Sequence, residues 1–255
     1  MEKRTTTTIP ANRIALSLLI PLLGALVLAS GVALLLGGPG ADPTNRSGTS
    51  LLLGGVGLFS WLLGLRWYGL QGLGLRGGRP LYAGIGFATL GWIAFLLARV
   101  FLVSSAPGVV VSPDFGRAFI YLLLFEAFAV QLWAFGLLFR GLAEWRGPLT
   151  AAVTSGIFFG AVASQFFEEA YLGTLTTFLY FVAWGVFYGM IRLRTGSILG
   201  AVIIQAMHTL TAWYILLPEA EPARAELHNL YLVAAVFYLL FIWRLWPSTE
   251  EDYRV

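Results

Sequence analysis

Long apolar runs recur along this 255-residue chain, and hardly a charged residue interrupts them. An α-helix needs about 20 mainly apolar residues to cross the roughly 30 Å hydrocarbon layer of a bilayer, and the runs reach that length. We therefore predict an all-α, polytopic membrane protein. The expected transmembrane helices, eight in number, lie at about residues 13–36, 50–70, 81–103, 118–140, 148–166, 171–191, 197–217 and 229–246.

Composition supports this class and excludes others. Hydrophobic residues make up 58% of the chain and charged residues 11%, which excludes an ordinary soluble protein. Cysteine is absent, so disulfides, thiol catalysis and a cysteine metal site are excluded as well. We expect residues 1–255 to form a single transmembrane domain. The expected partners are the lipid bilayer and another integral membrane protein, and no nucleic acid.

The basic residues predict the orientation. The first apolar segment is too long for a signal-peptide core and no cleavage pattern follows it, so we expect it to be retained. With the N-terminus inside, twelve of the sixteen Lys and Arg residues fall on the cytoplasmic side and four outside, as the positive-inside rule requires. An even number of spans places both termini in the cytoplasm, in a bacterial-type cell membrane. The four basic residues left outside are Arg46, Arg99, Arg117 and Arg224.

A short connection joins the apolar segments 171–191 and 197–217 and predicts an antiparallel hairpin. Arg192 and Arg194 place positive charge at the C-terminal end of the first helix, which the helix dipole favours. Gly196 can adopt the left-handed conformation that ends a helix, and Ser197 is placed to cap the next one. The middle of the second helix then carries three polar residues, Gln205, His208 and Thr209. Polar side chains at this depth in a membrane cost free energy, so their presence indicates a structural or functional role.

The motif G-x-x-x-G-x-x-x-x-R-T-G-S, followed by an apolar helix, resembles the third conserved block of the CPBP family. This family comprises the CAAX-protease and bacteriocin-processing, Abi-type intramembrane metalloproteases. The family's second block is opened by Gly-Pro and contains S-x-x-x-F-G, and Gly147-Pro148 followed by Ser155 to Gly160 matches that framework. The resemblance covers about residues 118–217 and implies a CPBP-protease-like helical bundle.

In this family, two glutamates and two histidines are thought to hold a metal ion and an activated water. At the matching positions this chain has neither residue type, so the resemblance implies a vacated site. Amide, hydroxyl and apolar side chains do not replace the hydration of a divalent ion, and we therefore expect no metal cofactor there. Gln131 and Gln205 are expected to hydrogen-bond to each other instead. The vacated positions are Val130, Gln131, Phe135, Ala163, Gln205 and Thr209.

A second hypothesis places a displaced site around Glu126 and His208. Both lie about nine residues from the outer ends of their helices, so they share a depth of roughly 13 Å. If they face each other, they would form a displaced metal or proton-relay site. The structural alternatives are a hydrogen bond between the two side chains, or separate hydrogen bonds from each of them to Ser and Thr neighbours. Two protein ligands are too few for a catalytic metal. Glu168 and Glu169 are further candidate ligands, or residues stabilised at a helix N-terminus.

Three functions remain open from these residues. The first is a catalytically silent CPBP-like protein, a pseudoenzyme that acts as a scaffold or accessory subunit for another membrane protein, or holds a lipid or pigment in the old cavity. The second is an active intramembrane metallo-endopeptidase with relocated ligands at Glu126, His208, Glu168 and Glu169. The third hypothesis, a small transporter, has less support, because a transporter would need more polar residues at the membrane midplane than this sequence has.

Overall fold

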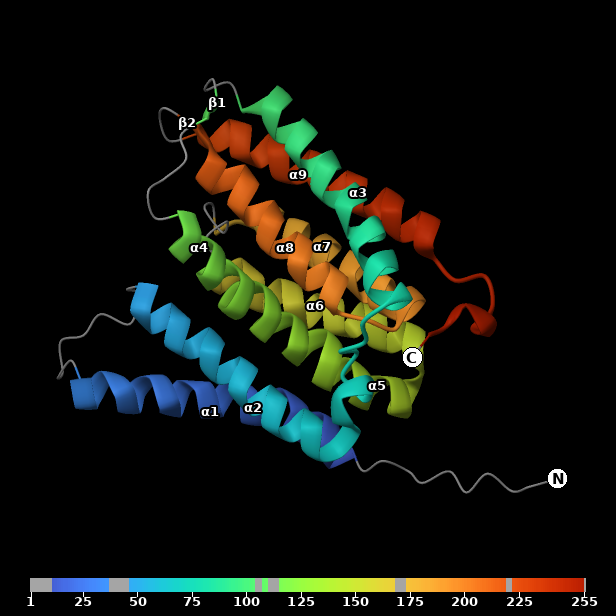
Figure 1. Ribbon diagram of the computed structural model, residues 1–255. Coiled ribbons are helices and arrows are strands. Elements are labelled where there is room, and N and C mark those ends of the chain that lie inside the picture. Colours follow the sequence, from blue (N-terminus) through green and yellow to red (C-terminus); the bar gives the residue numbers. More distant parts are fainter. Residues whose placement is uncertain are drawn as a thin grey trace.

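The computed structural model describes residues 11–36, 46–103, 107–109, 115–167, 173–218 and 222–254, and nearly all of them are helical (Figure 1). One long segment, Phe115–Arg146, combines α-helical and π-helical turns, and we refer to it as the central segment. The helices are α1 (Ala11–Leu36), α2 (Arg46–Gly72), α3 (Arg79–Leu102), α4 (Phe115–Tyr121), η2 (Leu122–Ala129), η3 (Leu132–Leu138), α5 (Phe139–Arg146), α6 (Pro148–Phe166), α7 (Leu175–Thr195), α8 (Leu199–Leu210), η4 (Thr211–Ile215), α9 (Arg224–Leu245) and the short η5 (Glu250–Asp252).

The predicted membrane fold is confirmed. Among the described residues, seven helices are long and apolar enough to cross a membrane, and Leu199–Ile215 is a shorter apolar helix at the position of the remaining predicted span. The ends differ most from the prediction at two places. The central segment continues to Arg146 rather than ending near residue 140, and α9 begins at Arg224 rather than residue 229.

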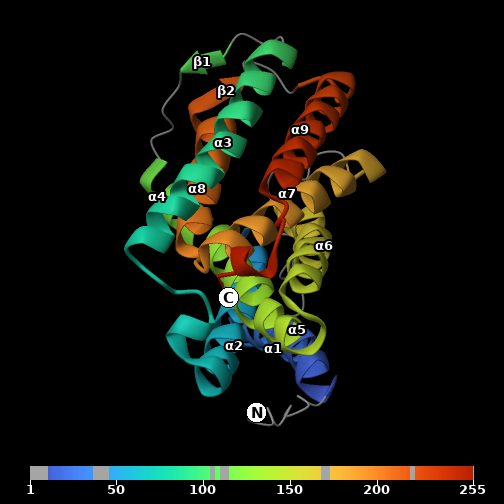
Figure 2. The ribbon, with the colours of Figure 1, turned by 90° about the vertical axis from the view of Figure 1, so that its right-hand side faces the viewer.

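The central segment and α7 form the middle of the bundle. In their most apolar stretches 78% and 67% of the residues are buried inside the protein, against 11% for α1. Helices α1 and α2 lie side by side at one edge, and α3, α8 and α9 cover the opposite side (Figures 1 and 2). The positions matched to the family blocks lie on the buried helices rather than on the peripheral hairpin.

Glycines allow α6 and α7 to approach within backbone contact. Gly156 and Gly160 on α6 face Val186 and Val182 on α7, and a Cβ atom at either glycine would meet those backbones at 2.5–2.7 Å. On α7, a Cβ at Gly185 would collide with the carbonyl oxygen of Gly156. Small residues spaced by four on both helices are typical of close packing between membrane helices. The G-x-x-x-G part of the sequence motif is therefore a packing surface.

The turn between α7 and α8 has the predicted form. Gly196 adopts φ 74° in the left-handed region and ends α7. The hydroxyl of Ser197 accepts a hydrogen bond from the Leu199 N–H at 3.3 Å and donates one to the Arg76 carbonyl at 2.7 Å. The Ile198 N–H donates to the Gly74 carbonyl at 2.9 Å. The R-T-G-S turn thus binds the turn between α2 and α3 at the same end of the bundle.

Helices α2, α5, α7 and α9 all end at this side of the bundle. We call it the arginine-rich end because four arginines lie in or just after these helices: Arg76, Arg140, Arg194 and Arg244. At the opposite end, β1 (Pro107–Val109) pairs with β2 (Leu216–Pro218) in an antiparallel ribbon with Gly108 opposite Leu217. The sequence prediction did not include this ribbon. Which end faces the cytoplasm stays a prediction from the basic residues.

Candidate functional site

All positions matched to the family blocks lie in the interior of the bundle. The central segment contributes Val130 and Gln131, between its π-helical stretches η2 and η3, and Phe135 from η3. Single π-helical turns occur frequently at functional sites. Helices α6 and α8 contribute the remaining positions. The exposed fractions are 0% for Val130, Phe135 and Ala163, 1% for Gln131, Gln205 and His208, and 2% for Glu126 and Thr209.

The two glutamines meet as predicted. The Gln131 Nε2 donates a hydrogen bond to Gln205 Oε1 at 2.8 Å, between the central segment and α8. Gln205 Nε2 in turn donates to the backbone carbonyl of Glu126 at 3.0 Å. A continuous chain of hydrogen bonds therefore runs from Gln131 through Gln205 to the Glu126 carbonyl, and it connects two of the matched ligand positions, Gln131 and Gln205. Each of these bonds satisfies a group that has no access to water.

Aromatic rings fill the space around the matched positions. The ring of Phe135 lies 5.5 Å from Phe159 on α6, centroid to centroid, and Phe159 makes edge contacts at 6.0 Å with Trp184 and Tyr188 on α7. Such pairs are favourable beyond the area they bury. Phe135, which stands where the family has arginine, is part of this apolar packing.

The displaced-site candidates are also buried, but their surroundings differ. The imidazole of His208 lies between two rings, with centroid distances of 4.3 Å to Phe95 and 4.7 Å to Trp184. Glu126 lies on the central segment, one helical turn from Gln131. The contact between Glu126 and His208 stays a prediction. Glu168 and Glu169 lie outside the described residues.

The donor set does not fit the family's metal. At the matched positions the two side-chain amides are engaged with each other, and the other side chains include a methyl group and a phenyl ring. Catalytic zinc is usually held by three protein ligands drawn from imidazole, carboxylate and thiolate groups. Among the described residues, no group of three or more His, Cys, Asp and Glu side chains is placed to hold a metal ion.

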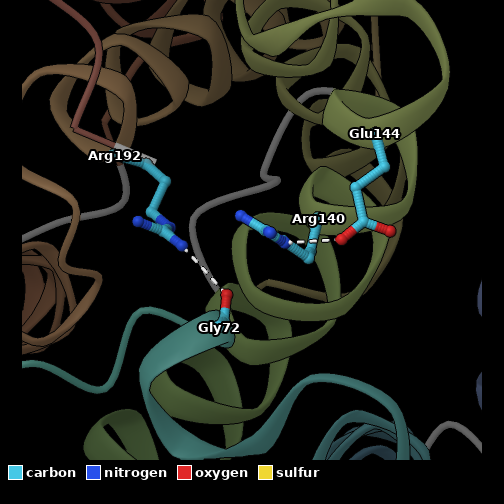
Figure 3. A network of polar contacts seen from close by, with 4 residues as sticks. All are labelled: Gly72, Arg140, Glu144 and Arg192. Atoms are coloured by element: carbon cyan, nitrogen blue, oxygen red, sulfur yellow. Dashed lines mark hydrogen bonds and ion pairs between the residues drawn. The ribbon is translucent and has the colours of Figure 1, made fainter. Parts of the chain in front are cut away.

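Arg192 is a buried side chain whose role the sequence did not reveal. Its Nε donates to the Phe135 carbonyl and its Nη2 to the Gly72 carbonyl, both at 3.1 Å, while the guanidinium lies 5.1 Å from the centre of the Phe139 ring. Figure 3 shows the bond to Gly72, with Arg140 turned towards Glu144 on its own helix. Arg192 thus ties α7 to η3 and to the end of α2.

Arg99 has a comparable place at the opposite end. Its side chain is 0% exposed, its Nη2 donates to the Leu216 carbonyl at 2.5 Å, and its guanidinium lies 4.9 Å from the centre of the Trp213 ring. We predicted Arg99 only as a basic residue on the outer side. Neither arginine differs in its sequence surroundings from exposed ones, so periodicity gave no signal of burial.

The C-terminal segment folds back onto the R-T-G-S turn. The Arg254 N–H donates to the Leu193 carbonyl at 2.9 Å, and Arg194 pairs with Asp252 at 2.7 Å. Hydrogen bonds from the Ser248 N–H and from Arg194 lower the pKa of the Asp252 carboxyl. The segment therefore covers the turn with a charged residue that stays ionised at neutral pH.

Fold and site together define a polytopic helical membrane protein whose interior contains a buried amide pair and a cluster of packed aromatic rings. Residues 113–211 match the family model of the type II CAAX prenyl endopeptidase Rce1-like proteins, so this part of the chain is similar to that family. The match includes the central segment, α6, α7 and α8, and it confirms the resemblance inferred from the framework residues. A search of curated proteins finds no match to the chain.

The amide pair allows a direct test by substitution. Changing either Gln131 or Gln205 alone to Leu leaves the other amide buried with a lost partner, which costs about 1–3 kcal/mol. The double change removes both polar groups, and we expect it to destabilise the protein less than the two single changes added together. Thermal unfolding of the three variants in detergent measures the coupling. Additive effects would show that the two amides do not stabilise each other.

Proposed function

We propose that this protein is a catalytically silent member of the Rce1-like family that serves as a scaffold or accessory subunit for another integral membrane protein. The Gln131–Gln205 hydrogen bond carries this proposal. It occupies two positions at which the family resemblance implies charged or imidazole ligands, and it keeps the helices in contact without a metal ion. The fold is then preserved for binding rather than for hydrolysis.

The burial of the positions matched to the family supports the proposal that the protein is catalytically silent. A hydrolase must bring water and a peptide bond to its ligands, and intramembrane hydrolysis needs an activated water beside them. Gln131 and Gln205 are each 1% exposed, and the rings of Phe135 and Phe159, both 0% exposed, pack against each other in the same interior. A closed, aromatic interior is suited to stability and is unsuited to substrate entry.

A partner would contact the apolar faces that the bundle leaves uncovered. Helices α1 and α9 are peripheral, and only 11% and 33% of their most apolar stretches are buried inside the protein. Lipid covers such faces in an isolated molecule. Helix–helix association in membranes depends on close packing and on hydrogen bonds rather than on hydrophobicity, so these faces are compatible with both neighbours.

The alternative function is an intramembrane metallo-endopeptidase that uses Glu126 and His208, with Glu168 or Glu169 completing the ligand set. The burial of two ionisable side chains on packed helices favours it, because such residues in membrane proteins are often functional. It requires zinc, whereas the silent protein requires none. Metal content therefore separates the two functions.

We expect protein purified in mild detergent, without a histidine tag, to hold far less than one zinc per chain and to leave a prenylated CAAX-type peptide intact. Elemental analysis and peptide mass spectrometry measure the two quantities. The chain has two histidines, which makes the controls simple. The variants are His208→Ala in the interior and His228→Ala on the exposed face of α9.

Stoichiometric zinc that is lost in His208→Ala and kept in His228→Ala would contradict the proposal and establish the relocated site. Zinc lost only in His228→Ala would identify a surface site beside Thr176, whose Oγ1 lies 3.2 Å from the His228 ring, and would leave the proposal standing. Cleavage of the peptide by the wild type, abolished by a chelator, would overturn it.

A further inference from the structure

An apolar groove opens between α3, α7 and α9 near the arginine-rich end. Its volume is about 360 Å³, in the range of small-molecule sites. Leu90 on α3 is 52% exposed, so the groove opens outward to the surface that faces lipid, while Phe187 on α7 is 1% exposed and forms its floor. The apolar walls are Phe87, Leu90, Phe187, Phe241 and Leu245.

Two arginines lie where this groove reaches the end of the bundle. Arg194 is near the last residue of α7 and Arg244 is near the last residue of α9, and both line the groove. Arg194 pairs with Asp252, whereas Arg244 has no ion pair among the described residues. The two lining arginines and the Asp252 carboxylate that pairs with Arg194 together carry two positive charges and one negative charge, which leaves the mouth of the groove positive.

A second, more polar hollow continues from the same two arginines. Its volume is about 300 Å³, and Trp243, Trp246 and Ser248 line it together with Asp252. Tryptophan side chains prefer the level of the lipid headgroups in a bilayer. The two hollows thus form one path that is apolar along the helices and charged at their ends.

We propose that this path is a binding site for an anionic phospholipid. An acyl chain lies along the apolar walls between Phe187 and Leu90, and the phosphate lies between Arg194 and Arg244. Basic pockets between membrane helices on the cytoplasmic side attract anionic headgroups, and the basic residues predict that orientation for this end. A guanidinium is well suited to phosphate because it donates parallel hydrogen bonds.

This site is separate from the positions matched to the family. None of the groove residues is a matched position, and Gln131 and Gln205 lie on the central segment and α8, which do not line the groove. A neutral lipid would use only the apolar walls. The arginines therefore make the headgroup charge the property that decides binding.

The test is competition between two lipids. Delipidated protein in mild detergent is offered an equimolar mixture of phosphatidylglycerol and phosphatidylcholine with identical acyl chains, and native mass spectrometry gives the ratio bound. We expect the wild type to prefer phosphatidylglycerol. Arg244→Gln, at an exposed position, should lower that preference about fivefold, and Arg194→Gln/Arg244→Gln should bring the ratio close to one.

Matched variants separate charge at this site from charge elsewhere. Arg66→Gln removes an exposed arginine from α2, away from the groove, and should leave the ratio unchanged. Leu90→Trp fills the groove and should reduce binding of both lipids. An equal ratio in the wild type, or an unchanged preference in the double variant with its helical content intact, would overturn the proposal. A dimer that Leu90→Trp dissociates would instead identify the groove as a contact between two copies.

Discussion

Gly185→Ala is expected to destabilise this protein by about 2 kcal/mol or more, although alanine is the better helix former. The added Cβ would collide with the backbone carbonyl oxygen of Gly156 and lie 2.9 Å from the ring of Phe159. A backbone atom cannot rotate away as a side chain can, so α6 and α7 must separate. Gly185→Val should prevent folding. Thermal unfolding in detergent, followed by circular dichroism, measures the loss.

Gly31→Ala is the matched control. It makes the same change inside a helix, but no atom lies within 4 Å of the added Cβ at Gly31 on α1. This variant should be as stable as the wild type, or more stable by up to about 1 kcal/mol. Equal stability of the Gly31 and Gly185 variants would show that the close approach of α6 and α7 is not needed for folding.

Arg192→Ala is expected to cost about 3 kcal/mol or more. The side chain donates to two backbone carbonyls, of Phe135 and Gly72, and each buried acceptor left without a donor costs about 1–3 kcal/mol. The change also removes the packing of the guanidinium against Phe139. The stability of Arg192→Lys should lie between that of Arg192→Ala and that of the wild type, because a lysine ammonium lacks the planar guanidinium that reaches both carbonyls.

Arg140→Ala serves as the control for lost charge at the same end. Arg140 pairs with Glu144 at 2.9 Å on the surface of α5, with both side chains more than 20% exposed, and such pairs contribute at most about 0.5 kcal/mol. Equilibrium unfolding of the three variants compares them directly. If Arg140→Ala and Arg192→Ala cost the same, the buried contacts of Arg192 contribute nothing specific.

Local features of the sequence predicted the spans and the R-T-G-S turn correctly. Hydrophobic run length depends only on neighbouring residues, and so does the preference of Gly196 for a positive φ, which the structure shows at 74°. The ends were less exact, since the central segment runs on to Arg146 with π-helical turns that no periodicity indicates. The ribbon between Pro107–Val109 and Leu216–Pro218 joins distant residues, and it was not predicted.

The amide pair was predictable for a different reason. The framework of the family fixes which positions of different helices face one another, so the spacing of Gln131 and Gln205 implied a contact that the structure shows at 2.8 Å. The family framework gave no such information about Glu126 and His208. The aromatic neighbours of His208, Phe95 and Trp184, come from two further helices and could not be assigned from the chain.

By itself, the sequence determined that this protein is a helical membrane bundle in which residues 113–211 resemble the Rce1-like family, and that the positions matched to that family lack charged ligands. Only the tertiary structure decided which arginines are buried and which remain at the surface. Arg192 and Arg194 are two residues apart on one helix, yet the first is 1% exposed and bonds to η3 and α2, while the second lines a groove with α9. Burial depends on the helices that pack around a side chain, and that packing is not local in the sequence.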